Sequence, residues 1–187
     1  MIKHESITIA FGFDKFKTLL YSIPTGLRRF LFRGVLLFIL WRVGYEYFLK
    51  PSGYLDSKLI EIVLVGTYKV LKFFYTDLLS SGYNIYIDGR LIITIAAPCN
   101  GLELMVLYLG FLFCLPTTWK RLLVFSISGI ILTTALNIVR CVLLAMLFYN
   151  HHGLADFMHH YLFKMLIYAV NFYLWVLYTK NSQLMKK

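Results

Sequence analysis

Charged residues are scarce in this chain, and acidic residues are the scarcest. Asp and Glu together number 9 against 19 Lys and Arg, and charged residues make up only 15% of the 187 residues. Hydrophobic residues make up 59%, and the mean hydropathy is +0.70. Ordinary soluble domains carry about 25% charged residues. The composition therefore excludes an ordinary soluble domain and indicates an integral membrane protein.

Cysteine is also rare, because only Cys99, Cys114 and Cys141 occur. None of them forms a CxxC pair or a Cys/His spacing typical of zinc, so neither a disulfide framework nor a metal centre is indicated. We expect no metal and no organic cofactor. Any cysteine chemistry must then belong to a single thiol, and Cys114 and Cys141 are interpreted as packing residues.

The net charge of +10 does not indicate nucleic-acid binding. No basic run is interleaved with the polar residues that a groove-binding surface needs. Most of the excess basic residues stand beside apolar segments, as is typical of charges that orient a protein in a membrane. The expected partner is therefore the lipid bilayer and not nucleic acid; the sequence predicts no oligomeric state.

Four apolar segments are long enough to cross a hydrocarbon core of roughly 30 Å at about 1.5 Å per residue. They are residues 31–49, 100–119, 122–149 and 160–178. We expect residues 31–179 to form one membrane-embedded domain, preceded by a basic cytoplasmic or interfacial segment, 1–30, and followed by a basic tail, 180–187. No small-residue cleavage site ends the first apolar run, so a cleaved signal peptide is not expected.

A fifth apolar segment, residues 59–79, has one polar face. At about 100° per residue its polar side chains gather on one side of a helix; they belong to Lys58, Glu61, Lys69, Lys72 and Thr76. Such a helix suits the membrane interface better than the hydrocarbon core. Residues 83–96 follow as two β-prone runs around Asp88-Gly89-Arg90, which predicts a β-hairpin.

Counting four spans places the N-terminal segment, the Lys120-Arg121 loop and the C-terminal tail on one side of the membrane. The positive-inside rule makes that side the cytoplasm. A fifth span at 59–79 would separate the N-terminal segment from the other two basic segments. The expected fold is therefore an all-α polytopic protein of the cytoplasmic (inner) membrane, with about four transmembrane helices, an interfacial helix and a small outward-facing hairpin.

Residues of three reactive types are expected at the same outer level of this arrangement. Cys99 lies at the outer start of the second span and His160 at the outer start of the fourth. Arg140 lies about eighteen residues, roughly 27 Å, beyond the inner end of the third span. His159 is an alternative to His160, and His151 and His152 are also close in sequence.

Two of these residues have a physical reason to be functional. Cys99 lies at a helix start, where backbone N–H groups and the helix dipole favour the nucleophilic thiolate. Arg140 lies inside an apolar run, where an arginine is costly unless it faces a cavity or a partner. A structural role for Arg140, bonded to backbone carbonyls or to Glu103, is the alternative.

Three short motifs that contain these residues resemble motifs of the exosortase/archaeosortase family of membrane-embedded transpeptidases. Ala97-Pro98-Cys99-Asn100-Gly101-Leu102 resembles its A-C-S-G-L nucleophile motif, and Asn137-Ile138-Val139-Arg140 resembles its N-x-x-R motif. His160-Tyr161-Leu162-Phe163 resembles the stretch that opens its last conserved helix. The resemblance covers about residues 83–175, roughly half of the chain.

The resemblance implies a thiol protease or transpeptidase that acts on a membrane-anchored protein substrate. It implies cleavage near a C-terminal sorting signal at the outer face of the membrane, with the new carboxyl end passed to an envelope acceptor or released by hydrolysis. Cys99 would be the nucleophile, Arg140 the oxyanion stabiliser and His160 the acid/base. Asn100, Gly101, Glu103 and Asn137 are the expected supporting residues.

The chain also departs from the family pattern. Asn100 replaces the usual Ser, Glu103 stands where many members carry a basic residue, and Lys164 occupies the place of a frequent Gly. The Asn100 replacement is interpreted as harmless. Glu103 and Lys164 suggest altered substrate recognition, or a subgroup of the family with its own target. The alternative function is a noncatalytic membrane subunit for envelope polymer assembly or export, in which Arg140 and Glu103 form an ion pair. A small transporter is less favoured, since the polar residues gather near one face of the membrane.

Overall fold

The computed structural model describes residues 25–115, 117–151 and 153–180. Its long helices are α2 (Thr25–Gly44), α4 (Tyr54–Leu71), α5 (Leu102–Cys114), α6 (Trp119–Tyr149) and α8 (Phe163–Thr179). Short helical turns are η1 (Tyr45–Leu49), α3 (Lys50–Ser52), η2 (Ala97–Cys99), α7 (Ala155–Phe157) and η3 (Met158–Leu162). The strands are β1 (Leu78–Ser81), β2 (Asn84–Ile87) and β3 (Arg90–Thr94). The expected mostly helical fold with a small β-element is confirmed, whereas most of segment 1–30 and residues 181–187 lie outside the described residues.

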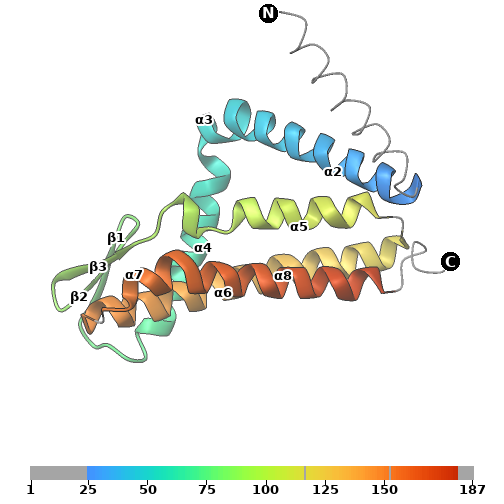
Figure 1. Cartoon of the computed structure of the whole chain (residues 1–187). Coiled ribbons are helices and arrows are strands. Elements are labelled where there is room, and N and C mark those ends of the chain that lie inside the picture. The colour runs from blue at the N-terminus through green and yellow to red at the C-terminus, as the bar shows by residue number, and fades with distance from the viewer. Residues whose placement is uncertain (1–24, 116, 152, 181–187) are drawn as a thin grey trace, which may run out of the picture.

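The helices form a bundle with the sheet at one end (Figure 1). Helix α6 contacts α5 and α8, and α2 packs on α5. Helix α4 runs across the bundle beside the sheet and contacts α6 (Figure 1). The last part of α6 reaches the sheet, because β3 and α6 are also in contact.

Helix α6 is the helix in the described residues that is both long and apolar enough to cross a membrane, with 31 residues. Helices α5 and α8 are apolar but shorter, and the four-span topology stays a prediction. The predicted span 100–119 is helical only from Leu102 to Cys114. Leu115 is extended, with φ −104° and ψ 128°, since a residue that precedes a proline avoids the helical region.

The predicted helix 59–79 was wrong at both ends. Helix α4 starts earlier, at Tyr54 after the left-handed Gly53, and it ends at Leu71. The following residues turn into β1, where Leu78 pairs with Ile87 of β2 and is buried. Strand pairing and burial therefore override the helical periodicity of this apolar stretch.

The sheet is an antiparallel meander in the order β1-β2-β3. The predicted hairpin 83–96 contains β2 and β3, and its turn residues Asp88 and Gly89 have φ values of 51° and 72°. Two successive positive φ values match the twist of the flanking strands. Strand β1 was not predicted, because its residues had been counted in the preceding helix.

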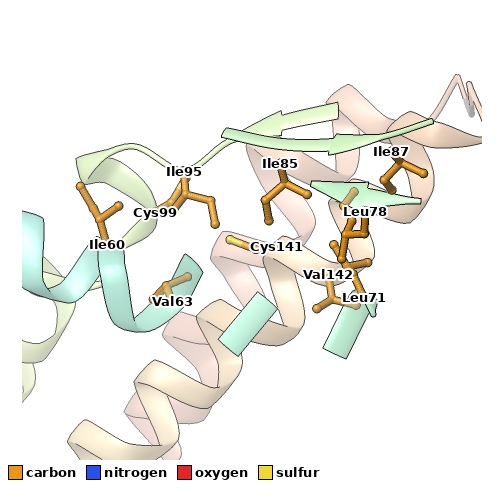
Figure 2. Packing of buried hydrophobic residues seen from close by; sticks show 11 residues of the cluster. Ile60, Val63, Leu71, Leu78, Ile85, Ile87, Ile95, Cys99, Cys141 and Val142 are labelled. Carbon is orange, nitrogen blue, oxygen red and sulfur yellow. The ribbon is translucent and has the colours of Figure 1, made fainter. Parts of the chain in front are cut away.

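The apolar core of the sheet end joins the sheet to α4 and α6 (Figure 2). Ile85, Ile87 and Ile95 are fully buried there, together with Leu71 of α4. Cys99 belongs to the same cluster. The turn that carries this cysteine is therefore fixed by packing and is not a free loop.

The opposite end of the bundle is closed by backbone carbonyls that accept side-chain hydrogen bonds. Arg121, in the first turn of α6, donates to the carbonyl oxygens of Leu177 and Tyr178 at 2.8 and 3.2 Å. The Tyr178 hydroxyl donates to the Leu112 carbonyl at 3.2 Å. These contacts tie α5, α6 and α8 together, and they satisfy carbonyls that a helix end leaves without a partner.

Candidate functional site

Cys99 lies in the short turn η2 between the sheet and α5. Its backbone N–H donates to the carbonyl of Ala96 at 2.8 Å. The next side chain, Asn100, is buried, and its Oδ1 accepts a hydrogen bond from the backbone N–H of Leu102 at 2.9 Å. A short amide side chain bonded two residues onward stabilises a turn. Asn100 therefore orders the entry into α5 at the position where the family motif carries Ser.

Gly101 allows α5 to begin directly against α6. Its φ of +76° lies in the left-handed region that side chains disfavour. A Cβ atom at this position would also overlap the side-chain amide of Asn137, which lies on α6. Asn137 is buried and donates through Nδ2 to the carbonyl of Thr133 at 3.0 Å. The absence of a side chain at Gly101 therefore brings the Cys99 turn next to this part of α6.

Arg140 contacts Cys99 although 41 residues separate them in the chain. Its Nη2 atom lies 4.0 Å from Sγ of Cys99 as a hydrogen-bond donor. The exposed fractions are 5% for Arg140 and 8% for Cys99, so the pair is shielded from solvent. The expected proximity of these two residues is present in the structure, while their catalytic roles stay predictions.

The environment of Cys99, which lies in the turn before α5, favours its charged form. Its pKa is lowered from 9.0 to about 6, first by a hydrogen bond from the Cys141 thiol and also by the positive charge of Arg140. Burial opposes this shift. A thiol with such a pKa is mostly thiolate at neutral pH, and the thiolate is the nucleophilic form.

The predicted acid/base histidine lies in η3, the turn that leads into α8. The backbone of His160 belongs to η3, but its side chain is outside the part of the structure that is described. His159 precedes it in the same turn and is partly buried. The choice of His160 over His159 therefore stays a prediction.

Glu103 does not pair with Arg140. It is exposed in the first turn of α5, and no ion pair or hydrogen bond joins it to Arg140 in the described ranges. A carboxylate in the first turn of a helix is favoured by the helix dipole, which accounts for a glutamate there without a partner arginine. The alternative in which Arg140 is bonded to Glu103 is thus not what the described residues show.

A cavity of about 310 Å³ is lined by Arg140 and by Ala97 and Asn100, which stand on either side of Cys99 in the chain, although Cys99 itself does not line it. Its walls come from α2, η1, α4, η2, α5, α6 and α8. The other lining residues include aromatic and charged side chains, namely Trp41, Arg42, Tyr45, Asp56, Glu103, Lys164 and Tyr168. Its volume is at the lower end of ordinary ligand pockets, enough for one or two residues of a peptide.

Sequence reasoning missed two neighbours of the site. Asp56, in the first turn of α4, accepts hydrogen bonds from the side-chain amide of Asn100 and from the Tyr45 hydroxyl. It lies between the predicted span 31–49 and the predicted helix 59–79, and an acid in the first turn of a helix was the available signal. Cys141 is buried in the apolar cluster, as its interpretation as a packing residue predicts, and it is also a neighbour of Cys99 that lowers the pKa of that thiol. No pattern in the sequence indicated that contact.

The residues of the site carry no set of metal ligands. Within the described ranges no group of three or more His, Cys, Asp or Glu side chains could hold a metal ion. The chemistry that the arrangement can perform with the side chains described is therefore attack by a buried thiolate next to a fixed positive charge.

A comparison with family models matches residues 8–177 to the transmembrane exosortase family. Neither the curated proteins nor the solved structures gave a match. The matched range includes Cys99 and Arg140, and α6 is long and apolar enough to cross a bilayer. The family and this helix together indicate a membrane protein. Because the match covers most of the 187 residues, the chain belongs to the transmembrane exosortase family.

Proposed function

We propose that this exosortase is a cysteine protease or transpeptidase that cleaves the C-terminal sorting signal of exported, membrane-anchored proteins. It acts at the outer face of the cytoplasmic membrane and passes the new carboxyl end to an envelope acceptor or to water. The observation that carries the proposal is the buried contact between Arg140 Nη2 and Cys99 Sγ at 4.0 Å. A nucleophile and a cation so placed, with a cavity that the cation and the residues Ala97 and Asn100 line, suit acyl transfer.

In the first step the Cys99 thiolate attacks the carbonyl carbon of the scissile peptide bond. Negative charge develops on the carbonyl oxygen, and the fixed guanidinium of Arg140 stabilises it in a site that excludes most water. Collapse of the tetrahedral intermediate breaks the C–N bond. The amine takes a proton from His160 as it leaves, and a thioester joins the substrate to Cys99.

In the second step a nucleophile with an N–H or O–H group attacks the thioester carbon. His160, now neutral, accepts the proton of that nucleophile, since an imidazole titrates near neutral pH. The C–S bond breaks and Cys99 leaves as a thiolate. An acceptor amine or hydroxyl gives the transfer product, and water gives the free acid.

The alternative, a noncatalytic subunit for envelope polymer assembly or export, rests on an Arg140–Glu103 ion pair. In the described residues Arg140 instead contacts the one thiol whose environment favours the charged form. If Arg140 had only a structural role, a leucine at position 99 would pack beside it as well as an uncharged cysteine does. The geometry therefore favours the enzyme.

The experiment is to trap the thioester. Full-length protein is co-expressed with candidate substrates that have C-terminal membrane anchors, denatured at acidic pH and examined by intact-mass and peptide mass spectrometry. We expect a hydroxylamine-sensitive adduct on the Cys99 peptide. Cys99→Ala and Cys99→Ser should both abolish processing while the protein stays inserted, and Cys114→Ala is the matched control that should process normally. Processing retained in both Cys99 variants excludes the enzyme.

The same assay identifies the histidine. His160→Ala should lower processing by at least about a hundredfold, as loss of an acid/base group does. His159→Ala should have a much smaller effect. The reverse result assigns the role to His159.

A further inference from the structure

A second thiol, Cys141, lies against the proposed nucleophile. It directly follows Arg140 on α6, and its exposed fraction is 0%. Figure 2 shows its sulfur pointing from α6 toward the turn that carries Cys99, inside the apolar cluster that contains both cysteines. Among the causes that lower the pKa of Cys99, hydrogen bonding to Cys141 is the largest. Two successive residues of α6, a guanidinium and a thiol, thus lie on the side of Cys99 that faces α6.

The surroundings of Cys141 are mostly apolar, because the residues packed in the same cluster are mostly aliphatic. Thr67 of α4 is fully buried and is the other polar neutral side chain that acts on this thiol. A polar group in such a setting is retained at a cost, because a buried donor without a partner is unfavourable. Packing alone would be served as well by valine or alanine.

The groups that act on Cys99 come from several elements. Cys141 and Arg140 belong to α6, and the positive charge of Lys164 on α8 acts from a greater distance. On α4, Asp56 contacts Asn100 and not the thiol. Of these groups, Cys141 lowers the pKa of Cys99 the most. A donor that bonds to the charged form of a group favours that form.

We propose that Cys141 is a positioning residue, whose thiol proton holds the Cys99 sulfur as an oriented thiolate between itself and Arg140. This inference rests on the proposed nucleophilic role of Cys99. Cys141 keeps its proton throughout, and no bond to its sulfur forms or breaks. When Cys99 becomes a thioester the hydrogen bond weakens, and it re-forms when the thiolate leaves.

The test measures the reactivity of Cys99 without any substrate. The purified full chain in lipid nanodiscs, with Cys114→Ala to remove the third thiol, is treated with iodoacetamide across a range of pH, and alkylation of the Cys99 peptide is followed by mass spectrometry. The parent protein should show a midpoint well below that of an ordinary thiol. Cys141→Ala should raise the midpoint by about one pH unit. Cys141→Ser, which keeps an O–H donor, should restore most of the shift.

Cys141→Val is the second donor-free variant and fills the space of the thiol, so it covers the case in which alanine fails to fold. An unchanged midpoint in the folded donor-free variants overturns the inference, and so does an equal rise in the alanine and serine variants. A parent midpoint near that of an ordinary thiol overturns it as well. If the parent midpoint is low and Cys141→Ala leaves it low, only the positioning role fails, because the proposed function is judged separately by the trapped thioester.

Discussion

The side-chain amide of Asn100 donates a hydrogen bond to the carboxylate of Asp56, 44 residues earlier in the chain. The same carboxylate accepts a hydrogen bond from the Tyr45 hydroxyl at 3.0 Å. Asp56 therefore joins the turn next to Cys99 to α4 and to η1. The residue that follows the proposed nucleophile is thus held by an acid outside the three motifs that resemble the family.

Replacing Asp56 should loosen this turn. Asp56→Asn removes the negative charge that accepts the hydrogen bonds of Asn100 and Tyr45. A hydrogen bond to a charged group contributes about 1.5 kcal/mol or more. We therefore expect the rate of substrate processing to fall by at least about tenfold. The measurement is processing of a substrate identified by the thioester experiment. Glu61→Gln, on the exposed face of α4 in an ion pair with Lys58, is the matched control and should process normally. Equal rates in both variants would contradict the role of Asp56.

Processing should depend on the protonation of Cys99. Its pKa is lowered to about 6 by the Cys141 hydrogen bond and by Arg140, so the reactive thiolate is lost as the pH falls through that value. The single-turnover rate should therefore rise between about pH 5 and 7 as Cys99 becomes a thiolate. It should fall again at higher pH, as the acid that protonates the leaving amine loses its proton. Quenched-flow measurements with excess enzyme test this. A rate that keeps rising tenfold per unit to pH 8.5 would indicate an ordinary thiol.

Removing the positive charge beside Cys99 should slow acylation. Arg140→Gln is expected to lower the single-turnover rate by about a hundredfold or more, as loss of an oxyanion donor does. Arg140→Lys keeps the charge but has a different donor geometry, and we expect an intermediate rate. Arg33→Gln, an exposed arginine on α2, is the control. Full activity in Arg140→Gln would leave Arg140 with a structural role only.

A side chain at Gly101 should destabilise the junction of α5 and α6. Gly101→Ala combines a positive φ with an overlap on Asn137, and we expect a loss of about 2 kcal/mol or more in stability. Gly101→Ala with Asn137→Ala removes the overlap but not the strained φ, so part of the loss should return. Thermal unfolding in detergent measures both. Gly34→Ala on α2, where a Cβ atom meets nothing within 4 Å, should be neutral or stabilising.

The topology is tested by labelling single-cysteine variants with an impermeant maleimide in intact cells. Leu91, in β3, is exposed, and Leu91→Cys should be labelled from outside. Lys120→Cys, in the first turn of α6, should be labelled only after the membrane is opened. A label that reaches position 120 but not position 91 would invert the predicted orientation.

The pairing of Cys99 with Arg140 could be anticipated because helix rise alone relates a sequence distance to a depth in the membrane. Periodicity also predicted most helices and the β2–β3 turn. It could not predict β1, because an apolar run reads as helix until its strand partners are known. Nor could it predict Asp56 or Cys141, since contacts of side chains on different helices depend on rotations about helix axes that sequence spacing does not give. The side chain of His160 is outside the described part, so its place relative to Cys99 stays a prediction.

The length of α6 determines how unfavourable its arginine is. Its 31 residues extend about 46 Å, some 16 Å more than the hydrocarbon core of a bilayer. If Trp119 lies at one edge of that core, the last ten or so residues of α6 stand beyond the other edge, and Arg140 begins this part. The same side chain at position 131 would lie in the hydrocarbon, where a charge is strongly unfavourable. With that placement, the excess length of α6 puts a buried cation at the level of water and the lipid headgroups.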